Sequence, residues 1–256
     1  MTAIGILVAT LPFIILSHYV AVLPHEFTHS FFAWALGYKS NPLNITYGGT
    51  SLSNLLLLSG IDENNNYQAI SENNPYHAAL IALAGPSMNV LLFFVSYWLL
   101  QKKQIHDRPY LYYFIFWFNI MNIANVFDYI PIRTFTPLNW NTDMSNVERG
   151  FNISPWIVYV VGGYFVLFII WQFFSKTLIE AYVYLHLKSP WLRAFLMIAA
   201  VLVLFAYFSL AGLRGFGEIS TFLSLTSRWL CPAIIFFCWP QRLWVRQKIA
   251  MIEKAQ

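Results

Sequence analysis

The segment His25-Glu26-Phe27-Thr28-His29 has the residue types and the spacing of a metal-dependent hydrolase. Histidines four positions apart lie on one face of a helix, so both imidazoles can bind the same metal ion. Glu26 lies between them and can reach a water molecule at that ion, where a carboxylate acts as a general base. The segment therefore predicts a zinc site in which His25 and His29 are ligands and Glu26 is catalytic.

This motif lies in an unusually apolar part of the chain. Apart from histidines, Glu26 is the only ionisable acidic or basic residue (Asp, Glu, Lys or Arg) between Ala3 and Leu36. Ionisable groups inside a membrane span are costly, and they usually pair, bind an ion or line a pathway. A helix over residues 3–37 would be longer than one untilted membrane span requires. Pro12 and Pro24 predict that the helix is kinked or broken, with Pro24 in the first turn of a new helical piece.

The composition is that of an integral membrane protein. Of the 256 residues, 58% are hydrophobic and 10% are charged, whereas soluble domains carry roughly a quarter charged residues. We expect a single membrane domain over residues 1–256, with the catalytic core in residues 1–150 and additional transmembrane helices in residues 151–256. The net charge of +4 requires no nucleic acid as a partner, because cytoplasmic loops of membrane proteins are basic.

The apolar segments predict an all-α protein with about six transmembrane helices. They cover residues 3–37, 77–100, 110–130, 156–174, 191–213 and 222–239. The Asn-rich segment 38–76 is expected to be mostly a solvent-side loop. Within it, β-branched and aromatic residues around Gly48-Gly49 predict a short β-hairpin in the 38–60 loop, and Leu55 to Leu58 could enter the membrane edge.

Six spans also predict which loops share a side of the membrane. One side, which includes both termini, collects ten of the 15 basic residues: Lys102, Lys103, Arg108, Lys176, Lys188, Arg193, Arg242, Arg246, Lys248 and Lys254. Positively charged loops are cytoplasmic, so both termini are predicted to be cytoplasmic. The loops 38–76 and 131–154 then lie on the opposite side and approach the site from related directions.

Polar side chains recur every three residues at the far end of the third span. They are Asn119, Asn122, Asn125 and Asp128. This spacing drifts slowly around a helix, so the four side chains form one stripe. We expect this stripe to line a path by which water reaches the metal site.

A catalytic zinc ion needs a third protein ligand and one open position. The candidates are the carboxylates Asp128, Asp143 and Glu148 and the histidines His18, His77, His106 and His186. His18 shares a face with His25 but lies two turns away, about 10 Å along the axis, which favours a structural role. Asp143 follows Asn141-Thr142 and is expected to open a helical turn, where an acidic side chain suits the positive helix end.

Three parts of this chain, in order, resemble the site-2 protease family of intramembrane metalloproteases. They are the His-Glu-x-x-His motif in an apolar span, Gly85-Pro86-Ser87-Met88-Asn89 in the next span, and a downstream Asn…Pro…Asp stretch. The resemblance covers about the first 150 residues. It implies that His25 and His29 bind zinc, that Glu26 is the catalytic base and that Asn89 lines the site near the substrate.

The third part departs from the family pattern Asn-x-x-Pro-x-x-x-Leu-Asp-Gly. Asn125 and Pro131 fit its beginning, but Asp143 comes several residues late and is followed by Met144 instead of glycine. Asp128 comes too early, before Pro131. The order of the pattern favours Asp143 as the third ligand, with Asp128 as the alternative.

The resemblance implies a zinc-dependent endopeptidase that hydrolyses peptide bonds of membrane-spanning protein substrates within the lipid bilayer. A transmembrane helix hides its peptide bonds, so such a substrate must unwind locally before attack. The competing hypothesis is a non-catalytic membrane protein that keeps a structural or vestigial metal site, or one that transports metal ions. A histidine pair that neither Asp143 nor Asp128 reaches would favour this second hypothesis.

Overall fold

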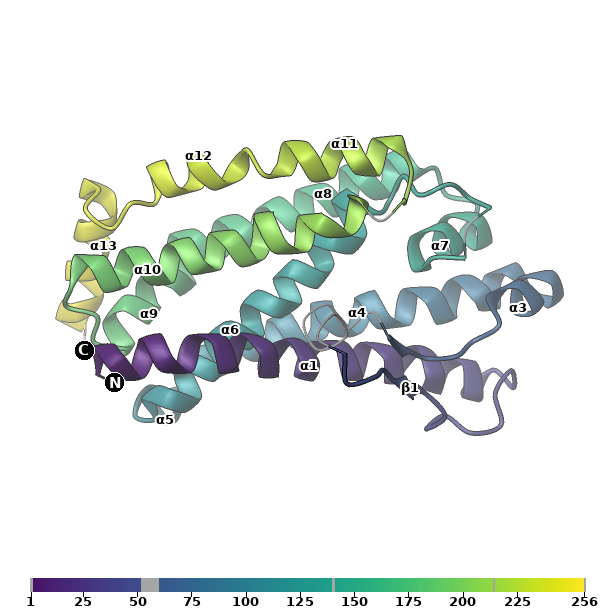
Figure 1. Ribbon diagram of the computed structural model, residues 1–256, viewed down its shortest axis with the longest axis horizontal. Helices are drawn as coiled ribbons and strands as arrows, with labels where there is room; N and C mark the ends of the chain where they lie inside the picture. The colour runs from purple at the N-terminus through teal and green to yellow at the C-terminus, as the bar shows by residue number, and fades with distance from the viewer. Residues whose placement is uncertain (1, 52–59, 140, 214, 256) are drawn as a thin grey trace.

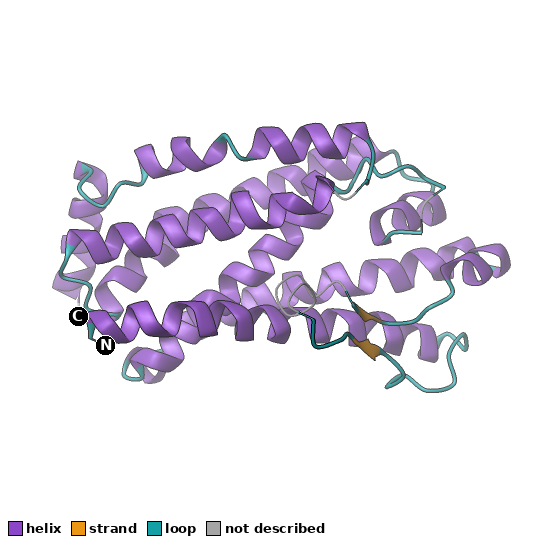
Figure 2. Cartoon of the chain, viewed as in Figure 1, coloured by secondary structure: helices purple, strands orange, loops and turns teal. Residues whose placement is uncertain are grey.

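The protein is a bundle of long helices with one very small sheet, as Figures 1 and 2 show. The computed structural model describes residues 2–51, 60–139, 141–213 and 215–255. It is 77% helical, and five helical segments among the described residues are long and apolar enough to cross a membrane: Ala3–Ala35, Pro75–Leu100, Pro155–Tyr184, Pro190–Leu213 and Glu218–Phe237. The predicted all-α membrane fold is confirmed.

The first half of the chain builds the part of the bundle that carries the predicted site. Its elements are α1 (Ala3–Ala35), β1 (Thr46–Tyr47), β2 (Ile61–Asp62), α3 (Tyr67–Asn73), α4 (Pro75–Leu100), α5 (Lys103–His106), α6 (Pro109–Phe127), the π-helix η1 (Asp128–Ile132) and α7 (Asp143–Phe151). Helices α1, α4 and α6 pack against one another, and α7 packs on α4.

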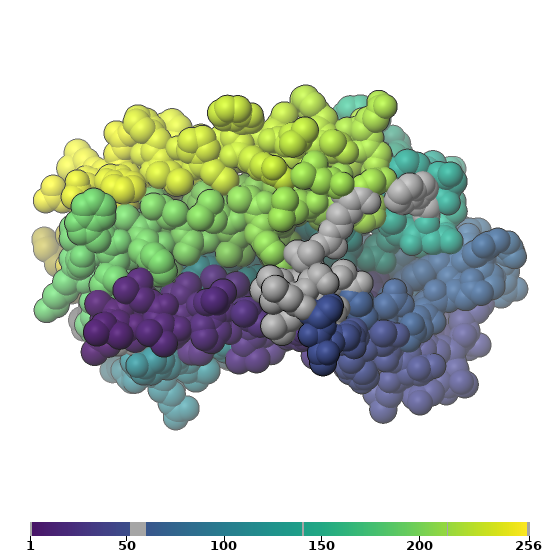
Figure 3. Space-filling model, in the orientation of Figure 1, coloured from purple at the N-terminus to yellow at the C-terminus, as the bar shows by residue number. Residues whose placement is uncertain are grey.

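The second half adds helices around this group. They are α8 (Pro155–Gln172), η2 (Phe173–Thr177), α9 (Leu178–Tyr184), α10 (Pro190–Val201), η3 (Leu202–Tyr207), η4 (Phe208–Leu213), α11 (Glu218–Ser227), α12 (Leu230–Phe237) and α13 (Leu243–Ala255). Helices α11 and α12 form the upper edge of the face seen in Figure 3, next to α10. Large apolar side chains of α8, α11 and α12 are exposed, as lipid-facing helices require.

Helix α1 is continuous from Ala3 to Ala35, with Pro12 and Pro24 inside it. The prediction that a new helical piece starts at Pro24 is therefore wrong. Prolines are tolerated inside transmembrane helices when side chains and neighbouring helices satisfy nearby backbone groups. The continuous helix keeps His25 and His29 one turn apart on its buried face.

Helix α6 is the predicted third span, and it runs through the interior of the bundle. Its large aromatic side chains Trp117, Tyr112, Tyr113 and Phe116 are fully buried. It is not among the five most apolar helices, because its tyrosines and asparagines lower its hydropathy. Burial within the protein makes this acceptable, since those polar groups face other helices and not lipid.

The predicted hairpin is present in a different form. Strand β1 pairs antiparallel with β2, with Thr46 opposite Asp62 and Tyr47 opposite Ile61. The second strand thus lies just beyond the predicted 38–60 loop. The predicted membrane-edge stretch Leu55 to Leu58 lies outside the described residues.

Both chain termini, α5 and α13 lie at one end of the bundle, and α3, β1 and α7 lie at the other (Figure 1). This is the arrangement that six crossings predict for the termini and for the loops 38–76 and 131–154. The cytoplasmic assignment of the termini stays a prediction.

Candidate active site

The two histidines of the motif turn the same ring nitrogen toward one point. The Nε2 atoms of His25 and His29 are 3.0 Å apart, and one oxygen of Asp143, Oδ2, lies 3.6 Å from each of them. Among the described residues, these three form the one group of His, Cys, Asp and Glu side chains whose ligand atoms could hold a metal ion. The imidazoles are almost completely buried.

Hydrogen bonds fix the tautomer of both imidazoles. The Nδ1 of His25 is 2.6 Å from the side-chain oxygen of Asn89, and the Nδ1 of His29 is 2.6 Å from the carbonyl oxygen of Ile81. Both partners are acceptors, so each Nδ1 carries the proton and each Nε2 presents a lone pair. Two lone pairs that face each other across 3.0 Å are the arrangement a cation stabilises.

The donor set and its spacing fit zinc. Zinc binds imidazole nitrogen and carboxylate oxygen at about 2.0–2.2 Å in tetrahedral geometry, so its ligand atoms lie roughly 3.3–3.5 Å apart. The observed separations of 3.0 Å and 3.6 Å bracket this value. Three protein donors leave a fourth position for water or substrate, which is the pattern of catalytic zinc sites.

Helix α7 positions Asp143. Thr142 caps this helix: its hydroxyl accepts from the backbone N–H of Ser145, and the Ser145 hydroxyl accepts from the N–H of Thr142. This reciprocal cap fixes Asp143 as the first helical residue, as the sequence predicted. Burial alone would raise the pKa of the Asp143 carboxyl, but positive charge at the point where it meets His29 and His25, whether on a protonated imidazole or on a bound cation, holds that pKa below its ordinary value. The carboxylate is therefore charged where it faces the two histidines.

Close packing of α7 on α4 brings the third group to the first two. A Cβ atom on Gly150 would overlap the carbonyl oxygen of Pro75 and would lie 2.6 Å from the Cβ of Ala79. Only glycine allows this approach, because any side chain would push the helices apart. Val147 packs into the small apolar cluster that also contains Ala78.

Gly85 is a residue of α4 that lies against the imidazoles of His25 and His29 in the packing of α4 on α1. A Cβ atom there would overlap the Nε2 of His29 and would lie 2.6 Å from the Nε2 of His25. The glycine of the Gly-Pro pair thus leaves the space in which the two nitrogens converge. This is a physical reason for a glycine at this position, in addition to the family resemblance.

Substitution of Gly85 by alanine is expected to lower zinc affinity by at least about tenfold and to destabilise the α1–α4 packing by about 1–3 kcal/mol, because the added methyl group displaces both imidazoles. Zinc content and thermal unfolding measure the two effects. Gly163→Ala in α8 is the matched control, since nothing lies within 4 Å of a Cβ there. Equal zinc content in both variants would contradict the role given to Gly85.

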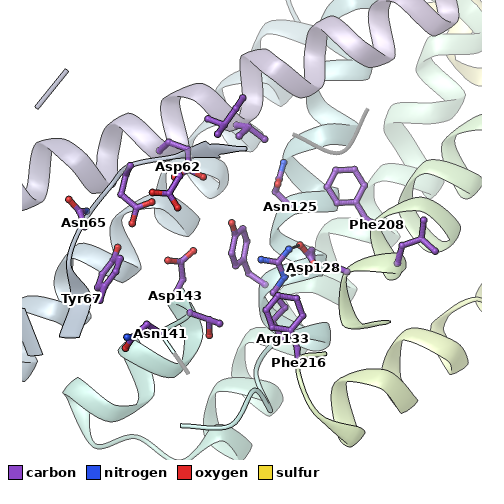
Figure 4. A pocket seen from close by; sticks show the side chains of 18 of the residues that line it. Asp62, Asn65, Tyr67, Asn125, Asp128, Arg133, Asn141, Asp143, Phe208 and Phe216 are labelled. Atoms are coloured by element: carbon purple, nitrogen blue, oxygen red, sulfur yellow. Dashed lines mark hydrogen bonds and ion pairs between the residues drawn. The ribbon is translucent and has the colours of Figure 1, made fainter. Parts of the chain in front are cut away.

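A polar cavity of about 600 Å³ opens beside the three groups. Glu26, Asp143 and Tyr129 line it together with the Asp62 to Glu63 segment. Asp143 and Arg133 approach it from opposite sides (Figure 4). The Glu26 side chain is half-buried and reaches this cavity from the same helix as the two histidines. The cavity can hold water and an extended stretch of peptide next to the three donors.

The other candidate ligands lie elsewhere. Asp128 forms an ion pair with Arg133, with 2.6 Å between Oδ2 and an Nη atom. His18 packs against Tyr207 and Phe208 in the cavity wall.

The four remaining candidate ligands are not part of the group that could hold a metal ion. His77 bonds to Tyr38, His106 stacks on Tyr184 and His186 is exposed. Glu148 is buried in α7, and burial raises its pKa to about 8.

Asn89 lies behind His25 and not on the cavity. Its side-chain oxygen accepts from His25, and its amide group donates to the carbonyl of Ala21 and to the side chain of Asn122 at 3.2 Å and 3.1 Å. The side chain is fully buried. Its hydrogen bonds in the structure are to protein groups, and the contact with substrate stays a prediction.

The polar stripe of α6 divides between two roles. Asn125 and Asp128 line the cavity, as predicted for a water path. Asn119 instead bonds to Ser96 and Asn122 bonds to Asn89, so these two tie α6 to α4. The three-residue spacing predicted that the four side chains share one face of α6, but it could not predict which of them line the cavity.

Three residues near the centre carried no signal in the sequence. Glu63 follows β2, is buried in the cavity wall, and its carbonyl accepts a hydrogen bond from Lys39. Tyr129 and Arg133 belong to η1 and the turn after it. None of them belongs to a local motif, because they reach the histidines only through the tertiary packing.

Comparison with known protein families identifies the kind of protein to which this chain belongs. Residues 13–222 match the peptidase family M50. The chain belongs to this family. M50 peptidases are zinc metalloproteases of the site-2 protease kind, which makes this chain a membrane metalloprotease, a hydrolase of peptide bonds. A search of curated proteins and of solved structures returned no match.

Proposed function

We propose that the protein is a zinc-dependent intramembrane endopeptidase in which His25, His29 and Asp143 bind the metal and Glu26 is the general base. The observation that carries this proposal is the convergence of two Nε2 lone pairs and one carboxylate oxygen within 4.8 Å of one another, next to a cavity that Glu26 also lines. Family membership agrees with it.

A zinc ion in this position supplies a Lewis acid that acidifies water and polarises the scissile carbonyl. Glu26 then takes a proton from the attacking water at its carboxylate oxygen. It delivers that proton to the nitrogen of the leaving amine as the C–N bond breaks. Asp143 and the two imidazoles stay fixed, because α7 and the Nδ1 hydrogen bonds hold them.

Asn89 has a positioning role in this proposal. It accepts the Nδ1–H of His25 and so keeps the Nε2 lone pair directed at the metal, as partners of metal-bound histidines commonly do. The expected contact between Asn89 and substrate stays a prediction. Ile81 does the same for His29 through its backbone carbonyl.

The proposed substrates are membrane-spanning proteins. The two histidines belong to a helix long and apolar enough to span the bilayer, while the cavity beside them is polar. A peptide bond must leave its helical hydrogen bonds before water can attack it. Polar cavity walls favour such an unwound segment because they can bond to its free backbone groups.

We also propose that both termini are cytoplasmic. The support is the ten basic residues near the end of the bundle that carries the termini. The cavity, bounded by β2 and α7, then lies toward the opposite face.

A non-catalytic metal site or a metal transporter is less well supported. That alternative would be favoured by a histidine pair without a carboxylate in reach, whereas Asp143 lies 3.6 Å from both nitrogens. It also gives no role to Glu26 on the cavity wall.

Metal removal tests the proposal. The purified chain, reconstituted in vesicles with a single-span model substrate that carries a helix-breaking Asn-Gly pair, should contain about one zinc ion per chain. It should cleave that substrate, lose the activity on chelation and regain it when zinc is returned. Cleavage that continues after complete zinc removal, or bound zinc with no cleavage of any single-span substrate, would contradict the proposed function.

A further inference from the structure

The hydroxyl group of Tyr129 lies next to the donor atoms of the proposed metal site. The hydroxyl oxygen of Tyr129 is 3.1 Å from the Nε2 of His25, which is the nitrogen that faces the metal position. The phenol ring stacks on the imidazole of His25, with ring centroids 5.0 Å apart and an interplanar angle of 16°. Tyr129 also lines the cavity with Glu26 and Asp143.

The Tyr129 ring also contacts a cation that is held in place by an ion pair. The guanidinium of Arg133 lies 5.0 Å from the ring centroid. Asp128 holds that guanidinium in two places, at 3.1 Å from Nε and at 2.6 Å from an Nη atom. A phenol in contact with both an imidazole and a paired guanidinium has little rotational freedom. The adjacent positive charge strengthens the phenol O–H as a hydrogen-bond donor.

The π-helix η1 gives Tyr129 its direction. Residues 128–132 form this wider turn at the end of α6 and include Pro131. A π turn spaces its hydrogen bonds five residues apart, so it rotates the side chains relative to a regular helix, and such turns are frequent at functional sites. The turn directs Tyr129 toward α1 and places Asp128 where it can pair with Arg133.

The hydrogen bond of Tyr129 depends on whether a metal is present. Because the Nδ1 of His25 donates to Asn89, its Nε2 accepts, and the Tyr129 hydroxyl must be the donor. A cation at the centre takes that lone pair. Among the described residues, the one hydrogen bond of this hydroxyl is the bond to His25. With metal bound, the hydroxyl is therefore a free donor aimed at the position where substrate oxygen enters.

We propose that Tyr129 is a further catalytic residue, whose hydroxyl donates a hydrogen bond to the carbonyl oxygen of the scissile peptide as negative charge develops on it. This inference rests on the proposed peptidase function. The oxygen of water bonds to the carbonyl carbon, the C–N bond breaks, and the proton passes through Glu26 to the amine nitrogen. Tyr129 keeps its own proton throughout, so its contribution is electrostatic.

Other nearby donors do not fit this role. The amide of Asn89 is used behind His25. The Tyr67 hydroxyl lies 3.4 Å from the Nδ1 of His29, on the side of that ring away from the metal position. The amide of Asn125 donates to the Met121 carbonyl. Tyr129 alone of these four directs an O–H or N–H toward the nitrogens that face the metal.

The Tyr129→Phe variant tests this inference because it removes one oxygen atom and keeps the stacked ring. We expect kcat to fall by about 10²–10³-fold, with KM changed by less than about threefold. Zinc affinity, measured by competition with a chromophoric chelator, should equal that of the wild type. The affinity for a peptidyl phosphinate, which mimics the tetrahedral state, should fall by about the same factor as kcat/KM.

Tyr110→Phe is the matched control, because Tyr110 lies at the other end of α6, is 55% exposed and does not line the cavity. It should keep the wild-type kcat and the wild-type affinity for the phosphinate. An unchanged kcat in Tyr129→Phe would overturn the inference. So would a loss of zinc affinity with a changed visible spectrum of the cobalt-substituted protein, since that result would make Tyr129 a metal ligand. Failure of the proposed function itself gives a different result, namely a zinc-loaded wild-type chain that does not cleave.

Discussion

Replacement of Glu26 by glutamine is expected to slow peptide cleavage by at least about 10³-fold while the chain keeps its zinc. Glutamine has nearly the same shape as glutamate, so the buried face of α1 and the two imidazoles should remain in place. The amide cannot accept a proton, however, and the attacking water then has no base. Cleavage of the single-span model substrate and zinc content, measured on the same preparation, test both halves of this expectation.

Asp62→Asn is the matched control for Glu26→Gln. It makes the same carboxylate-to-amide change in the wall of the same cavity, but its carboxylate bonds to the backbone N–H of Asn64 and not to the metal donors. We expect it to keep most of the activity. Near wild-type cleavage by a zinc-loaded Glu26→Gln protein would show that another group acts as the base.

Replacement of Asp143 by asparagine is expected to remove zinc from the purified protein. The variant loses the negative charge that faces two neutral imidazoles, and it loses the one carboxylate that lies 3.6 Å from both Nε2 atoms. The loss of affinity should exceed the roughly 10–100-fold that follows removal of a group hydrogen-bonded to a ligand. Zinc content after dialysis and a competition titration measure it.

Asp128→Asn provides the comparison, because Asp128 was the alternative ligand. Its carboxylate is paired with Arg133, so this variant should retain zinc with wild-type affinity. A protein that keeps zinc as Asp143→Asn and loses it as Asp128→Asn would reverse the assignment of the third ligand.

Much of the fold could be predicted from composition and local pattern. Long apolar runs identify membrane helices because the bilayer requires about 20 apolar residues per span. The cap of α7 was also predictable, because Asn141-Thr142-Asp143 satisfies the first backbone donors of a helix locally. The continuity of α1 was not, because whether a proline interrupts a helix depends on side chains and neighbours that satisfy the backbone around it.

The candidate site also has a part that could be predicted from the sequence and a part that could not. His25, Glu26 and His29 share one helix turn, so their spacing alone brings them together. Asp143 reaches the two histidines only because Gly150 lets α7 approach α4 closely. The order of the motifs favoured Asp143 as a ligand but did not predict this packing of the helices.

Tyr129 and Arg133 depend on the rotation produced by a π turn, which has no clear sequence signature. Asn89 bonds to His25, and the direction of its side chain could not be inferred from the motif. The side chain turns toward Nδ1 of His25 and away from the cavity.

The hydrogen bonds at the two Nδ1 atoms have a consequence for how the protein exchanges its metal. Asn89 and the Ile81 carbonyl order both imidazoles through contacts that form when α1 packs on α4. The entropy of ordering these ligands is therefore lost during folding and not during metal binding. Small zinc domains, by contrast, are unfolded without their ion. We therefore expect the apoprotein of this bundle to keep its helices, and circular dichroism before and after chelation would measure this.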